Sequence, residues 1–181
     1  MERRDLLRTL GVAAAFTLVP RSAQAAWARV AAAPTAPFTA LTTFQVSQID
    51  AIADTIFPRT DTPSATDVNM SAWIDIIVAE YYGDDERKQF QDGLAAIDGI
   101  AKGGQLPMPA YTPESNTKLV ELLEKGDRRS PEGRGYWRLK ALIVHGYFTS
   151  ERVQKEVLKT EVMPGRFVGD APHIVRSGSR P

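Results

Sequence analysis

The stretch LTTFQVSQIDAIADTIFP, residues 41–58, decides the fold class of this chain. Thr42 and Gln45 stand three residues apart, which is the spacing of a capping box at the N-terminus of a helix. Apolar residues then recur every three or four positions as far as Ile56, so they fall on one face of an α-helix. Pro58 cannot continue a helix. The stretch therefore predicts an amphipathic helix that ends just before Pro58.

Further segments downstream repeat this order of start signal, apolar stripe and stop signal. Thr112 and Ser130 each precede a proline, which is typical of a cap followed by the first helical residue. Gly83 and Gly126 stand where helices are expected to end. No segment alternates as a strand would, so the sequence predicts an all-α fold, a compact bundle of about five helices with extended ends. The helices after the first are expected over residues 67–82, 84–103, 113–125 and from 131 to about 147, with a short helical piece over 150–159.

The composition divides the chain into a helical domain and two flanking segments. The domain is expected over residues 41–160. Residues 26–40 are rich in Ala and Pro and are expected to form a flexible lead-in. Residues 161–181 contain several Gly and Pro residues, and such a tail without its own core is commonly ordered only on a partner. We therefore expect it to be extended and to lie as a strap across a partner.

Residues 1–25 have the pattern of a twin-arginine signal peptide. Two arginines are followed by two leucines, an apolar run over residues 10–19 and an A-x-A cleavage site. This route carries proteins that are already folded, and it predicts a periplasmic protein. An ordinary secretory signal is the alternative. The apolar run is too short to span a bilayer, so no direct membrane span is expected once the signal is removed. The residues of the signal are Arg3, Arg4, Leu6, Leu7, Ala23 and Ala25.

Charge and composition exclude several function classes. The chain has 22 basic and 22 acidic residues, and without residues 1–25 it has 18 and 20, a net charge of −2. This balance gives no reason to expect nucleic acid as a partner. The absence of cysteine excludes disulfides, thiolate nucleophiles, iron–sulfur ligands and covalent haem. The sequence also lacks a dinucleotide-binding glycine pattern and a nucleophile elbow. It therefore predicts no catalytic residue, no cofactor and no metal in this chain.

Several aromatic residues stand in adjacent pairs, and two neighbouring residues are too far apart around a helix to lie on the same narrow face. One member of each pair is expected to face the core and the other to be exposed, where Trp and Tyr are good interface anchors. The alternative is that all of them belong to the core and its rim. The aromatic candidates for a partner interface are Trp73, Tyr82, Trp137, Tyr147 and Phe148.

Three segments give the chain a family resemblance: residues 53–65, ADTIFPRTDTPSA; residues 146–151, GYFTSE; and residues 163–167, MPGRF. In this order behind a twin-arginine signal, they resemble the gluconate 2-dehydrogenase subunit 3 family. These are small subunits of periplasmic FAD-dependent sugar dehydrogenases. The resemblance covers roughly residues 38–173. Members often have a Cys shortly after the Pro-Gly motif, where this chain has Asp170, which puts in doubt any redox or disulfide role for the tail.

The resemblance implies a partner and a division of labour. The partner is a large FAD-containing subunit of the glucose–methanol–choline (GMC) class, which holds the FAD and the catalytic residues. A c-type cytochrome subunit is a further partner that the resemblance allows, and through such a partner the complex can associate with a membrane. The small subunit carries the large one through export and stabilises it. The C-terminal motif adds Pro164, Gly165 and Phe167 to the candidate interface.

A second hypothesis makes the chain an independent exported protein, either a helical ligand-binding protein or an enzyme. His145, Tyr147 and Glu151 stand on successive turns and could approach one another. Such a protein would need a pocket with convergent polar groups.

Overall fold

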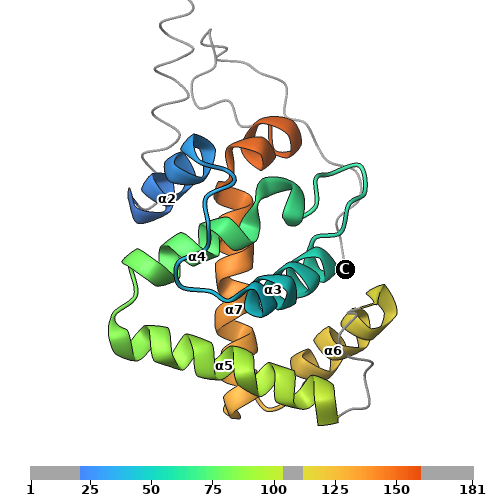
Figure 1. The fold of residues 1–181 in the computed structure, drawn as a ribbon. Helices are drawn as coiled ribbons and strands as arrows, with labels where there is room; N and C mark the ends of the chain where they lie inside the picture. The colour runs from blue at the N-terminus through green and yellow to red at the C-terminus, as the bar shows by residue number, and fades with distance from the viewer. Residues whose placement is uncertain (1–20, 104–111, 160–181) are drawn as a thin grey trace, which may run out of the picture.

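The computed structural model describes residues 21–103 and 112–159, and every regular element in these ranges is helical (Figure 1). The predicted all-α fold is confirmed. The two candidate sets at the ends of the chain, Arg3 to Leu7 and Pro164 to Phe167, lie outside the described residues. The elements are α2 (Arg21–Ala32), α3 (Thr43–Ile56), the 3₁₀ turn η1 (Thr66–Val68), α4 (Met70–Glu80), α5 (Asp84–Gly103), α6 (Pro113–Lys125), α7 (Pro131–Thr149) and the π-helical turn η2 (Val153–Val157).

Helix α7 runs through the middle of the molecule and the other helices pack around it (Figure 1). It contributes Tyr136, Leu139 and Ile143 to a core that is fully shielded from solvent. Phe90 of α5 and Trp73 of α4 are among the other large side chains that are fully buried. In the described ranges no helix is both long and apolar enough to cross a membrane.

Helices α5 and α7 cross at a pair of glycines. A Cβ added to Gly135 would lie 2.6 Å from the Cα and 2.7 Å from the carbonyl oxygen of Gly93. Such distances are shorter than carbon atoms tolerate, so the two backbones touch without any side chain between them. This close approach lets Phe90 and Leu94 on the same side of α5 reach the core.

The helix starts predicted at Thr42, Thr112 and Ser130 are confirmed in detail. The Thr42 hydroxyl accepts a hydrogen bond from the Gln45 backbone N–H at 3.3 Å, and Gln45 Oε1 accepts one from the Thr42 N–H at 2.9 Å. This is the reciprocal pair of a capping box. The hydroxyls of Thr112 and Ser130 cap α6 and α7, each with proline as the next residue.

The structure differs from the prediction at residue 69. A single helix was expected over residues 67–82, but η1 and α4 are separated by Asn69, whose φ is +56°. This left-handed conformation ends the first turn, and Asn is one of the few residues that tolerates it. The periodic apolar pattern continues through the break, so the pattern alone could not locate it.

The flexible lead-in expected over residues 26–40 is wrong for its first part, because α2 extends to Ala32. Ala26 and Val30 are buried, and Trp27 packs against the core. With Ala23, these positions have helical spacing. The helical periodicity is therefore present in the sequence. Alanines carry little apolar surface, however, and the stretch does not stand out from its Ala- and Pro-rich surroundings.

The carboxylate of Asp75 fastens the connection between α2 and α3 to α4. One oxygen accepts hydrogen bonds from the backbone N–H groups of Ala40 and Leu41, both at 2.9 Å. The other accepts from the Thr39 N–H at 2.9 Å and the Thr39 hydroxyl at 3.1 Å. Four donors therefore converge on one buried carboxylate. It supplies hydrogen-bond acceptors to backbone N–H groups that lie outside the helices.

The glycine crossing predicts that Gly135→Ala destabilises the protein. The added methyl group meets the backbone of Gly93, which cannot move aside without shifting α5, so the free energy of unfolding should fall by about 1–3 kcal/mol. Gly99→Ala on α5 is the matched control, since a Cβ there meets nothing within 4 Å. It should raise stability by about 0.5–1 kcal/mol through helix propensity. Urea unfolding followed by circular dichroism measures both, and equal shifts would contradict the crossing.

A second prediction concerns Asp75→Asn. An amide offers one acceptor oxygen where the carboxylate offers two, so two of the four donors lose their acceptor, at least one of them a backbone N–H. The free energy of unfolding should fall by about 2–3 kcal/mol. Asp85→Asn, at an exposed position, is the control and should change stability by less than about 0.5 kcal/mol. Thermal unfolding of both variants checks this, and a neutral Asp75→Asn variant would show that the carboxylate does not hold the connection.

Candidate functional site

Two of the three segments that carry the family resemblance lie side by side in the fold. The Tyr147 hydroxyl donates a hydrogen bond to the Pro63 carbonyl oxygen at 2.7 Å. Its ring stacks on Phe57 with centroids 3.9 Å apart and planes 4° from parallel. The Phe148 ring meets Phe57 edge-on at 5.7 Å. The loop that follows α3 is thus fastened to the C-terminal end of α7.

Carboxylates at both ends hold this loop in one conformation. Asp54 accepts hydrogen bonds from the Thr66 N–H at 2.9 Å and the Thr66 hydroxyl at 2.8 Å. Asp67 accepts from the Ser64 N–H at 2.9 Å and pairs with Arg59. The Ser64 N–H is the main reason that the pKa of Asp67 lies below its usual range, because the bond favours the charged carboxylate. Local polar contacts therefore hold the loop in this conformation.

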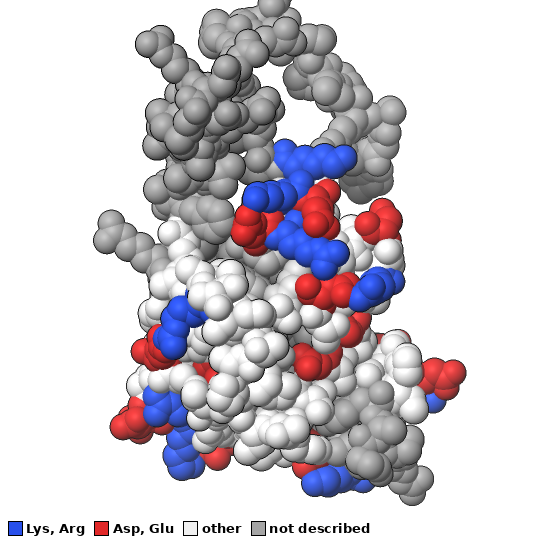
Figure 2. All heavy atoms as spheres, turned by 45° about the horizontal axis from the view of Figure 1, so that its top comes forward, with Lys and Arg blue, Asp and Glu red and all other residues white. Residues whose placement is uncertain are grey.

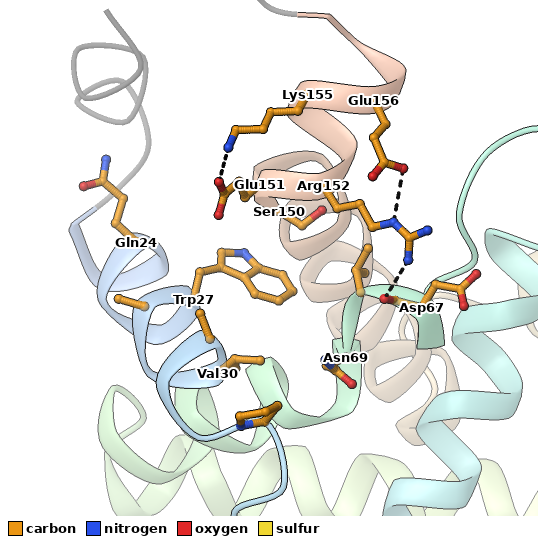
Figure 3. Close-up of a pocket in the computed structure, with 14 residues that line it drawn as sticks. Gln24, Trp27, Val30, Asp67, Asn69, Ser150, Glu151, Arg152, Lys155 and Glu156 are labelled. Carbon is orange, nitrogen blue, oxygen red and sulfur yellow. Dashed lines mark hydrogen bonds and ion pairs between the residues drawn. The ribbon is translucent and has the colours of Figure 1, made fainter. Parts of the chain in front are cut away.

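A groove of about 650 Å³ lies between α2, η1 and η2 (Figure 3). Trp27 and Val30 form its apolar side, from α2, and Val68 of η1 adds to it. Across the groove, Arg152 donates to the carbonyl oxygen of Asp67 and pairs with Glu156 at 3.2 Å. Since these charges satisfy each other, the groove suits packing against a partner surface better than binding a charged small molecule.

The charges on this end of the molecule are mixed in sign. Figure 2 shows basic and acidic side chains close together on this face. Lys155 pairs with Glu151, as Arg152 does with Glu156, each four residues apart. This face therefore presents no extended field of one sign to a partner.

A second surface lies at the N-terminal half of α7, beside α5. The Arg128 guanidinium stands 3.7 Å from the centre of the Trp137 ring, and the Lys140 ammonium stands 5.0 Å from it. Arg134 and Arg138 line the same hollow, of about 660 Å³. Trp and Arg are the residue types that contribute most at protein interfaces. The indole N–H of Trp137 is buried and has no acceptor among the described residues.

The five aromatic interface candidates do not share one environment. Trp73 is 1% exposed and Tyr147 is 3% exposed, so both belong to the core of this chain and neither is accessible to a partner. Tyr82 and Trp137 are half-buried, and Phe148 is 42% exposed. On α7, Tyr136 and Tyr147 are buried, Trp137 is half-buried and Phe148 is exposed.

The residues of the ligand-binding alternative are not brought together. The Tyr147 hydroxyl is directed inward to Pro63, and Glu151 pairs with Lys155. His145 is exposed, with its ring 6.0 Å from that of Trp73. Within residues 21–103 and 112–159, no group of three or more acidic or histidine side chains is arranged to hold a metal ion.

One titratable residue that the sequence did not single out faces the space between α3 and α6. Asp50 is half-buried in a hollow that Asn116 also lines. Burial raises the pKa of Asp50 above its usual value, and a hydrogen bond with Ser71 opposes that shift. An acidic residue on the polar side of an amphipathic helix gives no sequence signal that would distinguish it from a solvated one.

Comparison with known proteins agrees with this arrangement. Residues 44–165, more than half of the chain, match the gluconate 2-dehydrogenase subunit 3 family. The match includes α3, the loop after it and the end of α7. No similar protein was found among curated proteins or among solved structures. The chain therefore belongs to the gluconate 2-dehydrogenase subunit 3 family, whose members are accessory subunits of dehydrogenase complexes.

Proposed function

We propose that this chain is the non-catalytic small subunit of a periplasmic FAD-dependent sugar or glycoside dehydrogenase. Its partner is a large flavoprotein of the GMC class that holds the FAD and the catalytic residues. The small subunit carries this partner through twin-arginine export and stabilises it. The observation that carries the proposal is the division of aromatic residues on α7, which leaves Trp137 half-buried and Phe148 42% exposed toward opposite ends of one helix.

Association is the mechanism by which such a subunit acts. A surface that binds only the folded partner shifts the partner's folding equilibrium toward the folded state by mass action. Trp137 flanked by Arg128 provides a flat ring with charged neighbours, a combination that is enriched among the residues contributing most to binding. Phe148 adds apolar area at the other end of α7, where it packs on the loop fixed by Asp54 and Asp67. Both anchors thus rest on rigid supports, which limits the entropy lost on binding.

The export role follows from the signal at residues 1–25. Proteins that take the twin-arginine route are folded before they cross the membrane. A large subunit without its own signal can cross only if it is already bound to a subunit that has one. The surfaces of α7 that bind the partner must therefore form in the cytoplasm. A chain without cysteine needs no disulfides, so its folding does not depend on an oxidising compartment.

The proposal predicts co-purification from the native host. When the full chain with a C-terminal tag is purified from the periplasm, a larger protein with flavin absorbance should accompany it in constant ratio. A control strain that expresses an Arg3→Lys, Arg4→Lys variant should retain both proteins in the cytoplasm. A colourless protein of about 20 kDa, purified alone, would contradict the proposal and favour an independent exported protein.

The surface aromatics give a matched pair of variants. Phe148→Ser removes a ring that is 42% exposed at the end of α7, and Phe44→Ser removes one that is 45% exposed on α3. Loss of an interface aromatic costs about 1–2 kcal/mol of binding, so Phe148→Ser should weaken the affinity for the large subunit about tenfold. Phe44→Ser should leave it unchanged. Titration by surface plasmon resonance measures both, with the melting temperature of each free subunit as the check on folding. Equal affinities would remove Phe148 from the interface.

A further inference from the structure

Helix α2 is part of the core rather than an appendage. Ala23 is 2% exposed, and its carbonyl oxygen accepts a hydrogen bond from the Trp73 indole N–H at 3.3 Å. The Trp27 ring stacks on Trp73 with centroids 5.7 Å apart, and its own N–H donates to the Thr149 hydroxyl at 3.1 Å. Near the other end of α2, Arg29 pairs with Glu80 of α4. Side chains of α4 and α7 thus hold α2 along its length.

The position of Trp73 depends on a glycine in α7. A Cβ added to Gly146 would lie 2.8 Å from the Trp73 ring and 2.8 Å from the sulfur of Met70. The indole therefore fills the space between α2 and α7 in van der Waals contact with both helices. Detaching α2 would expose this indole and leave its N–H without the Ala23 acceptor. The contacts of α2 with Trp73 therefore also support the packing of α4 against α7.

The same helix contains the A-x-A sequence that ends the export signal. Signal peptidases act on small side chains at the last and third-last positions before the cut, which here are Ala25 and Ala23. Proteolysis also requires a stretch of backbone that is free of helical structure and of tertiary contacts. Ala25 is exposed, but Ala23 is buried and both lie inside α2.

We infer that the bond between Ala25 and Ala26 is closed to processing in the folded protein and that the mature chain keeps α2 whole. This inference rests on the export function proposed above. Cutting at this bond requires α2 to detach from α4 and α7 first, so the packing of Trp27 and Trp73 sets the rate of cleavage. A chain that folds before export would therefore carry its signal segment with it after crossing.

Cleavage of purified protein tests the inference directly. The full chain with a C-terminal tag is incubated with signal peptidase in detergent micelles, and products are identified by intact mass. Trp27→Ala loosens α2, Ala28→Ser alters an exposed position of the same helix as a control, and a synthetic peptide of residues 1–32 is the unfolded reference. Wild type and Ala28→Ser should be cut after Ala25 about tenfold or more slowly than Trp27→Ala and the peptide.

Two results would overturn the inference. If the folded wild-type chain is cut after Ala25 as fast as the peptide, α2 does not protect the bond. If the peptide is also resistant, packing is not the reason for the resistance. Failure of the proposed function is seen separately: a chain that stays in the cytoplasm of the native host refutes export, whereas a periplasmic chain whose mass begins at Ala26 refutes only the retention of α2.

Discussion

The fold depends on one steric constraint, the contact of two backbones where α5 crosses α7. Gly93 and Gly135 meet without intervening side chains, and this sets the distance at which the remaining residues of both helices interdigitate. Further along α7, Gly146 gives Trp73 of α4 a place against the helix in the same way. Helix α5 thus packs against one end of α7 and α4 against the other, and α7 has a glycine at each of these contacts. Larger residues there would separate the helices and open the core.

The sequence predicted the elements whose ends are determined locally. Thr42, Thr112 and Ser130 are caps because a hydroxyl reaches a backbone N–H three residues away, and no other part of the chain is needed. The glycine contacts could not be predicted, since they depend on which helix lies opposite. The break at Asn69 and the helix α2 were not predicted either. At Asn69 the apolar pattern continues through the break, and in α2 the alanines carry too little apolar surface to stand out.

The candidate site was likewise predicted only in part from the sequence. Adjacent aromatic pairs on α7 predicted that one ring of each pair would be buried, and Tyr136 and Tyr147 are. The pattern could not exclude Trp73, which occupies the space between three helices. Two of the segments that suggested the family have a structural role among the described residues: Tyr147 and Phe57 fasten a loop to α7. A packing role accounts for these residues, and the chemistry of a dehydrogenase complex does not have to reside in them.

The carboxylate of Asp75 has a mechanical consequence. The connection that follows α2 is bound to α4 through three backbone N–H groups, while α2 itself is bound to α4 through Trp27 and Trp73. A pull on the N-terminal end of the chain is therefore borne first by the contacts of α2 and then by Asp75. The load ends on α4, so α3 and the loop behind it stay unstrained until that anchor fails.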